Sequence, residues 1–185
     1  MIVLHFDGLY RGIPGGLRSA RHAGVMCYGW LISRDGVVIA RGHGGYARGR
    51  DATSNIAEYL AMIEGLEALR DLGLEREPVE VIGDARSIIQ QMEGVAAVNS
   101  PRVRPLYARA VRLARHFHQL IWVWRPRRDN HQADQLTRRA LRQIRADAAG
   151  YQRTLAVLEG TERMQDQKRF HSLLDLRIYQ PLNAG

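Results

Sequence analysis

A β-hairpin is predicted by residues 24–43, which read GVMCYGWLISRDGVVIARGH. Gly24–Ser33 is rich in Val, Tyr, Trp, Leu and Ile, residue types that favour strands. An Asp-Gly turn at residues 34–36 joins this strand to a second one at Val37–His43. Ile2–Asp7 comes before the hairpin as an apolar run that stops at an Asp-Gly pair, so we expect an antiparallel meander of three strands.

Outward from this meander, the chain alternates between helical and strand patterns. Apolar residues recur at helical spacing over residues 56–72, between capping residues at 53–55 and a glycine stop at Gly73. The other predicted elements are loops at 11–16 and 44–51, strands at 78–83 and 120–124, a short helix at 85–92, and helices at 101–118 and 130–148. This order predicts an α/β fold with a five-stranded mixed sheet, a three-strand antiparallel meander plus two parallel strands, flanked by helices.

The pattern changes after residue 149, so we expect one domain at residues 1–149 and a C-terminal extension at 150–185. Residues 151–170 have the character of one more helix, which makes the extension predominantly helical. Residues 173–179 are apolar enough to dock on another surface. That surface is either the domain itself or a second subunit. The sequence leaves both open, although we expect a monomer.

Arginine dominates the charge of the chain. The net charge is +8, and 26 of the 27 basic residues are arginines, with twelve of them in residues 102–145. Such a cluster favours a polyanionic partner, because a guanidinium can fork onto phosphate oxygens. A solvated helix face in an arginine-rich genome explains the same composition, so charge alone leaves nucleic-acid binding open.

Composition also limits the setting in which the chain works. Apolar residues make up 45% of it, which excludes wholesale disorder. The single cysteine, Cys27, cannot form an internal disulfide, so a reducing cytoplasm is the simplest location. No apolar run approaches the roughly 18–20 residues of a membrane span, and the sequence after Met1 has no basic leader. We therefore expect no membrane association.

Four acidic residues stand at the ends or starts of predicted elements that can converge. Asp7 ends the first strand, Glu58 is in the first turn of the long helix, Asp84 ends the fourth strand, and Asp134 is near the start of the last helix. Phosphodiester cleavage needs positive charge against the phosphate and an activated water. Two Mg²⁺ ions bridged by carboxylates supply both.

Each of these acids also has a purely structural explanation. Glu58 fits a capping box, Asp84 and Asp134 fit helix starts, and Asp7 fits a turn. For any one of them alone the structural explanation is favoured. Four together at one edge of a sheet favour a metal, because an uncompensated carboxylate cluster is costly.

Four segments around these acids resemble the catalytic blocks of type 1 ribonuclease H. The segments are residues 6–8 (FDG), 53–59 (TSNIAEY), 82–86 (IGDAR) and 127–136 (RRDNHQADQL). The resemblance spans roughly residues 1–148. Within the family, the chain is most similar to the compact archaeal and bacterial branch, because residues 94–101 are too short for the long basic protrusion of other branches. It implies the ribonuclease H-like fold.

The resemblance also implies an activity: hydrolysis of the RNA strand of RNA–DNA hybrids, leaving 3′-hydroxyl and 5′-phosphate ends. Asp7, Glu58, Asp84 and Asp134 are implied to hold two Mg²⁺ ions, for which Mn²⁺ can substitute. An assisting basic residue is implied at Arg127, with His131 as a competing candidate that could equally be a surface residue. The implied substrate contacts are Gly8, Thr53, Ser54, Asn55, Arg86, Arg104 and Asn130.

Two positions depart from the family pattern. Ile13 and Ser54 stand where the family often has asparagines that contact sugars. Selectivity for RNA through its 2′-hydroxyl is therefore weaker or rearranged. Two alternative functions stay open: a nucleic-acid-binding module of this fold with little or no catalysis, and a DNA nuclease, because one fold hosts several phosphoryl transfers.

Overall fold

A single mixed sheet organises the computed structural model, which describes residues 1–13, 23–161 and 164–180. Within these ranges six strands lie in the order β5-β4-β1-β2-β3-β6. Their bounds are β1 (Ile2–Gly12), β2 (Gly24–Arg34), β3 (Val37–Arg48), β4 (Pro78–Gly83), β5 (Gln119–Trp124) and β6 (His171–Tyr179). The β1–β2, β2–β3 and β3–β6 pairs are antiparallel, and β4 runs parallel to both β1 and β5.

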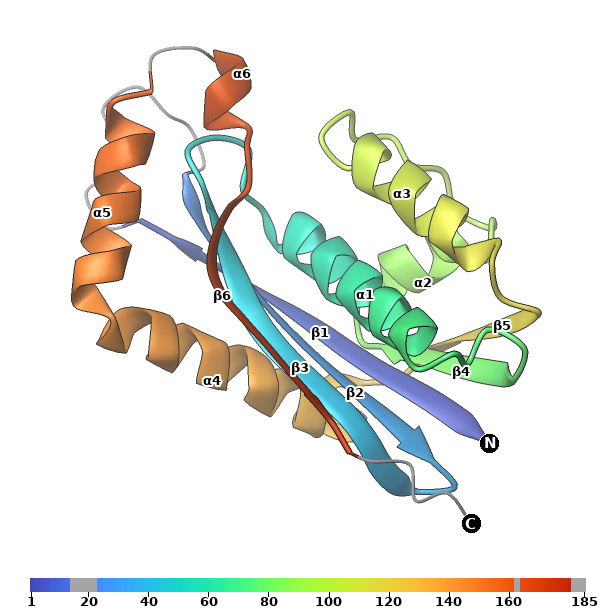
Figure 1. Cartoon of the computed structure of the whole chain (residues 1–185). Coiled ribbons are helices and arrows are strands. Elements are labelled where there is room, and N and C mark those ends of the chain that lie inside the picture. The colour runs from blue at the N-terminus through green and yellow to red at the C-terminus, as the bar shows by residue number, and fades with distance from the viewer. Residues whose placement is uncertain (14–22, 162–163, 181–185) are drawn as a thin grey trace.

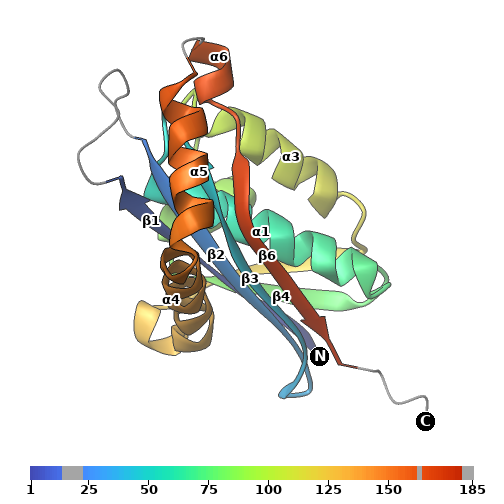
Figure 2. The ribbon, with the colours of Figure 1, turned by 60° about the vertical axis from the view of Figure 1, so that its left-hand side comes forward.

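Helices cover both faces of the sheet. Their bounds are α1 (Ser54–Asp71), α2 (Arg86–Met92), α3 (Arg104–Ala114), α4 (His131–Ala146), α5 (Ala148–Glu159) and α6 (Met164–Gln167), with a 3-10 turn η1 (Arg127–Asp129) before α4. Helices α1 and α3 lie on one side, while α4 and α5 lie on the other (Figure 1, Figure 2). The main core forms between α1 and the sheet, where Phe6, Trp30 and Tyr59 are fully buried.

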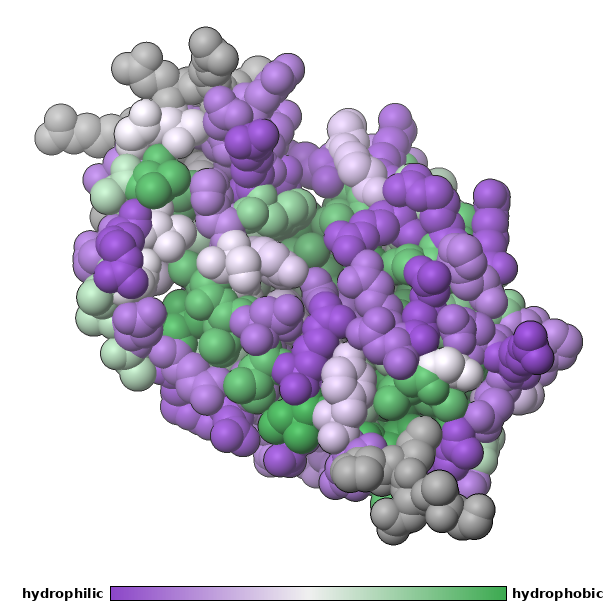
Figure 3. Space-filling view, in the orientation of Figure 1, coloured by the Kyte–Doolittle hydropathy of each residue, from purple (hydrophilic) through white to green (hydrophobic). Residues whose placement is uncertain are grey.

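Hydrophilic and hydrophobic residues gather on different parts of the surface (Figure 3). In Figure 3 hydrophilic residues cover the side of α1 and α3, and hydrophobic residues gather in the hollow between α5 and β6. That hollow is lined by Ile144, Val157, Leu173 and Leu174 among others. None of the described helices combines the length and the apolar character that crossing a membrane requires.

Most of the predicted elements are confirmed. The three-strand meander is present, Thr53 caps α1 by accepting a hydrogen bond from the Ile56 N–H at 3.3 Å, and Gly73 follows α1 with a positive φ of 69°. The strand predicted at residues 78–83 is β4. The order of helices and strands up to α4 agrees with the α/β architecture expected from the sequence.

The strand count differs from the prediction, and two strands continue several residues further than predicted. The sheet has six described strands instead of five, because residues 171–179 form β6. β1 continues past Asp7 to Gly12, and β3 continues through the predicted loop to Arg48. Of the loop expected at residues 11–16, positions 14–16 lie outside the described residues, as do positions 162–163 of the expected helix at 151–170.

The extension beyond residue 149 contains both helix and strand. α5 and α6 agree with its expected helical character, whereas β6 completes the sheet beside β3 (Figure 2). The apolar tail thus docks on its own domain. Arg177 secures it by an ion pair with the buried Glu64 of α1 at 2.7 Å. The division of the chain into a domain and an extension stays a prediction.

Candidate active site

Three of the four predicted carboxylates meet at one edge of the sheet. Asp7 comes from β1 and Asp84 from the residue after β4. Glu58 comes from the second turn of α1 and not from the first as predicted, because α1 begins at Ser54. Each offers an oxygen such that all three atoms lie within 4.8 Å of one another. Asp7 and Asp84 converge because β1 and β4 are parallel neighbours in a register that pairs His5 with Ile82, and each acid lies two residues further along its chain segment.

The close approach of α1 to β1 brings Glu58 into this cluster. A Cβ atom placed on Gly8 would lie 2.2 Å from the Glu58 nitrogen and 2.3 Å from the Ala57 carbonyl carbon. Only glycine allows the two backbones to lie this close. Gly8 therefore positions Glu58 through packing. The substrate contact expected of Gly8 stays a prediction.

Glu58 is held where its charge is poorly compensated. Its side chain is buried, and its Oε2 atom has no hydrogen-bond partner among the described residues. Burial, followed by the charges of Asp7 and Asp84, raises the pKa of Glu58 well above its ordinary value. A backbone hydrogen bond from Gly8 and the charge of Arg127 oppose the shift without cancelling it.

Asp7 has a similar environment. Only 2% of its surface is exposed, and burial together with the charge of Asp84 raises its pKa to about 7. The Thr137 hydroxyl lies 2.9 Å from Asp7 Oδ2 and works against this shift by stabilising the carboxylate. Burial also raises the pKa of Asp84. Three neighbouring acids with raised pKa values form a site that a divalent cation can compensate.

Asp134 lies beside this cluster and is paired with arginines. Its carboxylate accepts hydrogen bonds from Arg127 and, at 2.7 Å, from Arg138. Burial opposes ionisation of Asp134, but the hydrogen bonds from Arg138 and Arg127 outweigh it and lower its pKa. Asp134 is close enough to raise the pKa of Asp7, although its oxygens are outside the 4.8 Å group.

The side chain of Asn130 joins the start of α4 to β1. Its Nδ2 donates to the Phe6 carbonyl at 2.8 Å, and its Oδ1 lies 3.1 Å from His5 Nδ1. Asn130 is only 1% exposed. The substrate contact expected of Asn130 stays a prediction that this environment does not favour, because its amide is buried and already bonded. Asn130 fixes the position of α4, which carries Asp134.

Most of the remaining predicted site residues lie at the protein surface. The side chains of Ser54, Asn55, Arg86, Arg104, Arg127 and His131 are exposed, and Thr53 is half-buried. Arg86 lies over the Trp124 ring, with 5.6 Å between its Cζ atom and the ring centroid. Arg104 donates to the Val98 carbonyl at 3.3 Å. Ile13, one of the two departures from the family pattern, is half-buried beside β1.

Sequence reasoning missed three residues that hold the carboxylates in place. Thr137 and Arg138 follow Asp134 by three and four positions, so they share its helix face. That spacing was a signal that could have identified both. Trp124 donates from Nε1 to the Asp84 carbonyl at 3.0 Å. It has no comparable sequence signal, because the contact depends on the pairing of β4 with β5.

Known proteins resemble this chain in sequence and in structure. Residues 20–140 match the family described as reverse transcriptase-like. A ribonuclease HI from Halobacterium salinarum is 37% identical over 138 residues, which are 74% of this chain and 62% of the relative. The chain thus spans less than two thirds of that curated relative.

Two solved structures share the fold over nearly their whole length. The crystal structure of RNase H1 from Halobacterium salinarum has a TM-score of 0.66 and 33% identity, covering 77% of this chain and 98% of that one. LC11-RNase H1 in complex with an RNA/DNA hybrid has a TM-score of 0.65 and 28% identity, with coverage of 77% and 98%. These matches show that the chain belongs to the reverse transcriptase-like family and has the fold of type 1 ribonuclease H.

Proposed function

We propose that this chain is a metal-dependent endoribonuclease that hydrolyses the RNA strand of RNA–DNA hybrids. The observation that carries the proposal is the group formed by Asp7, Glu58 and Asp84, in which the buried Glu58 Oε2 atom has no hydrogen-bond partner in the described part of the chain. The solved neighbour bound to an RNA/DNA hybrid supports the choice of substrate. The cleavage leaves 3′-hydroxyl and 5′-phosphate ends.

The donor set fits two Mg²⁺ ions held by Asp7, Glu58, Asp84 and Asp134. All four offer hard carboxylate oxygens, which Mg²⁺ prefers. Bound Mg²⁺, or Mn²⁺ in its place, supplies positive charge against the phosphate and lowers the pKa of a coordinated water. The raised pKa values of Asp7 and Glu58 fit this role, because a cation supplies the compensation that the described protein groups do not.

Arg127 is the better candidate for the assisting basic residue. It pairs with Asp134, and its charge acts on Asp7, Asp84 and Glu58. If Asp134 were a ligand of a bound cation, the Arg127 guanidinium would be free to bind a phosphate oxygen of the substrate or product. His131 is exposed on the first turn of α4, and none of the described hydrogen bonds or ion pairs links it to the carboxylates.

The substrate strand lies against the start of α1. Thr53, Ser54 and Asn55 are at least partly exposed there, next to Glu58. Their hydroxyl and amide groups can bond phosphate and sugar oxygens, including the 2′-hydroxyl that distinguishes RNA from DNA. Arg86 and Arg104 add positive charge on the same side of the sheet. We expect Ser54, where the family often has asparagine, to make this recognition weaker.

The proposal also includes the setting. We propose that the chain acts as a monomer in the cytoplasm. A buried free cysteine, Cys27, whose pKa burial raises to about 12, fits a reducing compartment.

One cleavage experiment tests the proposed function. The protein is incubated with an RNA–DNA hybrid, double-stranded RNA and duplex DNA of the same sequence, with Mg²⁺ or with EDTA. We expect Mg²⁺-dependent cleavage of RNA in the hybrid alone. Equal cutting of duplex DNA would identify a DNA nuclease instead. Tight hybrid binding without cleavage under any divalent cation would identify a binding module.

A further inference from the structure

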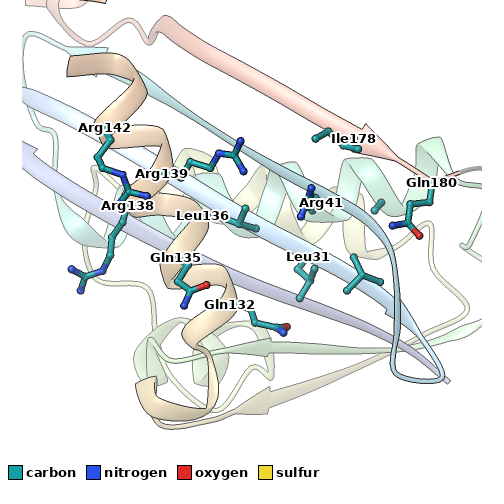
Figure 4. Close-up of a pocket in the computed structure, with 12 residues that line it drawn as sticks. Leu31, Arg41, Gln132, Gln135, Leu136, Arg138, Arg139, Arg142, Ile178 and Gln180 are labelled. Carbon is teal, nitrogen blue, oxygen red and sulfur yellow. The ribbon is translucent and has the colours of Figure 1, made fainter. Parts of the chain in front are cut away.

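A groove lies along α4, on the face of the sheet opposite α1. Its volume is about 530 Å³ (Figure 4). Leu31 of β2, Leu136 of α4 and Ile178 of β6 give it an apolar floor. Figure 4 shows Leu136 and Arg139 on the flank of α4 that faces β3 and β6, and Arg138 on the other flank. The groove is thus an open space between one helix and the uncovered part of the sheet.

The rim of this groove carries unbalanced positive charge. Arg41, Arg138, Arg139 and Arg142 all line it, and none of the described residues in its lining carries a carboxylate. Arg138 pairs with Asp134. Within residues 1–13, 23–161 and 164–180, no ion pair compensates Arg41, Arg139 or Arg142. Clustered guanidinium groups over an apolar floor fit a ligand with both anionic and apolar parts.

Helix α4 links the groove to the candidate active site, because it carries Asp134 beside the carboxylate cluster and Arg138 and Arg142 in the lining of the groove. Asp134, Arg138 and Arg142 occupy one stripe of the helix at successive intervals of four residues. Each interval advances about 6 Å along the helix axis, a step similar in size to that between successive phosphates of an extended strand. A strand that leaves the carboxylate cluster can therefore place its first phosphates on Arg138 and Arg142, and then bend around α4 to Arg139 and the apolar floor (Figure 4).

We propose that this groove binds an unpaired, single-stranded extension of the nucleic-acid substrate. The inference rests on the proposed function, because it takes the carboxylate cluster as the point where the strand begins. The arginines bind the phosphates, and the apolar floor receives the faces of the bases. A duplex is stiff over lengths of about 150 base pairs, so it cannot bend around α4 into the groove, whereas a single strand can.

Binding is measured by fluorescence anisotropy in EDTA, where the hybrid stays intact, with blunt hybrid and with hybrid carrying an unpaired extension on either end. The test variant combines Arg139→Ala and Arg142→Ala, since both side chains are exposed and alanine is compatible with helix. The control combines Arg76→Ala and Arg153→Ala. It removes the same charge from exposed positions that do not line the groove.

For the unaltered chain we expect one of the extensions to tighten binding by roughly five- to tenfold, through two or three added phosphate contacts. The test variant should lose this gain and keep blunt-hybrid affinity and Mg²⁺-dependent cleavage of blunt hybrid. The control variant should keep the gain. An unchanged gain in the test variant overturns the proposal, as does the absence of any gain in the unaltered chain.

Two further outcomes distinguish this inference from the proposed function and from a peptide-binding groove. If the unaltered chain cleaves no hybrid, the proposed function fails. An extension-dependent gain that disappears only in the test variant still supports the groove as a single-strand site. If a glutamate-rich peptide with apolar residues binds in an Arg139- and Arg142-dependent way while extensions have no effect, the groove is a peptide site and the inference is wrong.

Discussion

At the scale of single residues, the carboxylate cluster lowers the stability of the cation-free protein and at the same time suits the binding of cations. Asp7 and Glu58 are buried next to each other and to Asp84. In the absence of cations, burial and mutual repulsion make their ionisation unfavourable, as their raised pKa values indicate. A site built to bind two divalent cations has this property, because the cations provide the compensation.

Asp7→Asn tests the chemical role of this cluster. It removes a proposed cation ligand while keeping the size of the side chain. We expect hybrid cleavage to fall by more than about a hundredfold. Hybrid binding in EDTA should stay within about threefold, because the arginines proposed to contact the hybrid, Arg86, Arg104 and Arg127, are unchanged. Cleavage rates and anisotropy measure the two effects. A variant that cleaves at the unaltered rate would remove Asp7 from the proposed mechanism.

The same variant gives a pH prediction for the cation-free protein. Asp7 has a folded-state pKa of about 7 against an ordinary value of 3.8. Because the folded state holds this proton more tightly, the stability linked to it is present below about pH 4 and is lost as pH rises to about 7. We therefore expect Asp7→Asn to match the unaltered chain near pH 4 and to exceed it at pH 7 by roughly 1–3 kcal/mol.

Urea unfolding in EDTA across this range measures the difference. Titrating groups that do not interact with Asp7 affect both proteins alike and cancel in the comparison, whereas the pKa of Glu58 falls in the variant because the charge of Asp7 is gone. A difference in the free energy of unfolding that stays constant between pH 4 and pH 7 would contradict the raised pKa of Asp7.

At the scale of elements, the contact between β1 and α1 positions the site. Gly8→Ala would place a Cβ atom 2.2 Å from the Glu58 nitrogen, so backbone must shift. We expect a loss of about 2–4 kcal/mol in the free energy of unfolding, at the upper end of overpacking effects, and lower cleavage because Glu58 moves. Gly12→Ala on the same strand is the control, since its Cβ would be 3.5 Å from its nearest neighbour, the Tyr10 hydroxyl. Equal stability of the two variants would contradict this account.

The elements that the sequence predicts well are those specified by local signals. The Asp-Gly turn at residues 34–36, the Thr53 cap and the positive φ at Gly73 are all encoded within a few residues. The convergence of Asp7 and Asp84 follows from one topological rule about parallel strands. Asp134 was also placed near the cluster correctly, although its pairing with Arg127 and Arg138 was not foreseen.

The elements that it predicts poorly depend on distant partners. Gly44 and Gly45 resemble a loop, yet both are within β3. A Cβ on Gly44 would lie 2.1 Å from the Leu174 carbonyl oxygen of β6, and one on Gly45 would lie 2.7 Å from Ile144 of α4. These glycines allow close tertiary approach, which no short window reveals. The burial of Asn130 could not be predicted for the same reason, because its partners are on β1.

At the scale of the whole molecule, the C-terminal strand is tied to the core by Arg177. Its guanidinium, 25% exposed, pairs at 2.7 Å with Glu64, which is 3% exposed, and at 3.2 Å with Asp71. Tyr46 donates a further hydrogen bond to Glu64 at 2.8 Å. Loss of Arg177 would leave a buried carboxylate without its main counter-charge.

We expect Arg177→Met to lower the free energy of unfolding by about 2–4 kcal/mol, because a buried ion pair loses one partner. Adding Glu64→Gln should restore part of this loss. The control Arg169→Ala breaks an exposed pair with Asp166 and should cost less than about 1 kcal/mol. Urea unfolding measures all three variants. Equal effects of Arg177→Met and Arg169→Ala would show that β6 is held without this ion pair.

The most direct measurement of the central claim is anomalous diffraction from crystals of the chain grown with Mn²⁺ and an RNA–DNA hybrid. The account predicts two Mn²⁺ peaks about 3.5–4 Å apart, with Asp7 between them, Glu58, Asp84 and Asp134 as further ligands, and Arg127 released from Asp134. A site without Mn²⁺, with Asp134 still paired to Arg127 and Arg138, would contradict it.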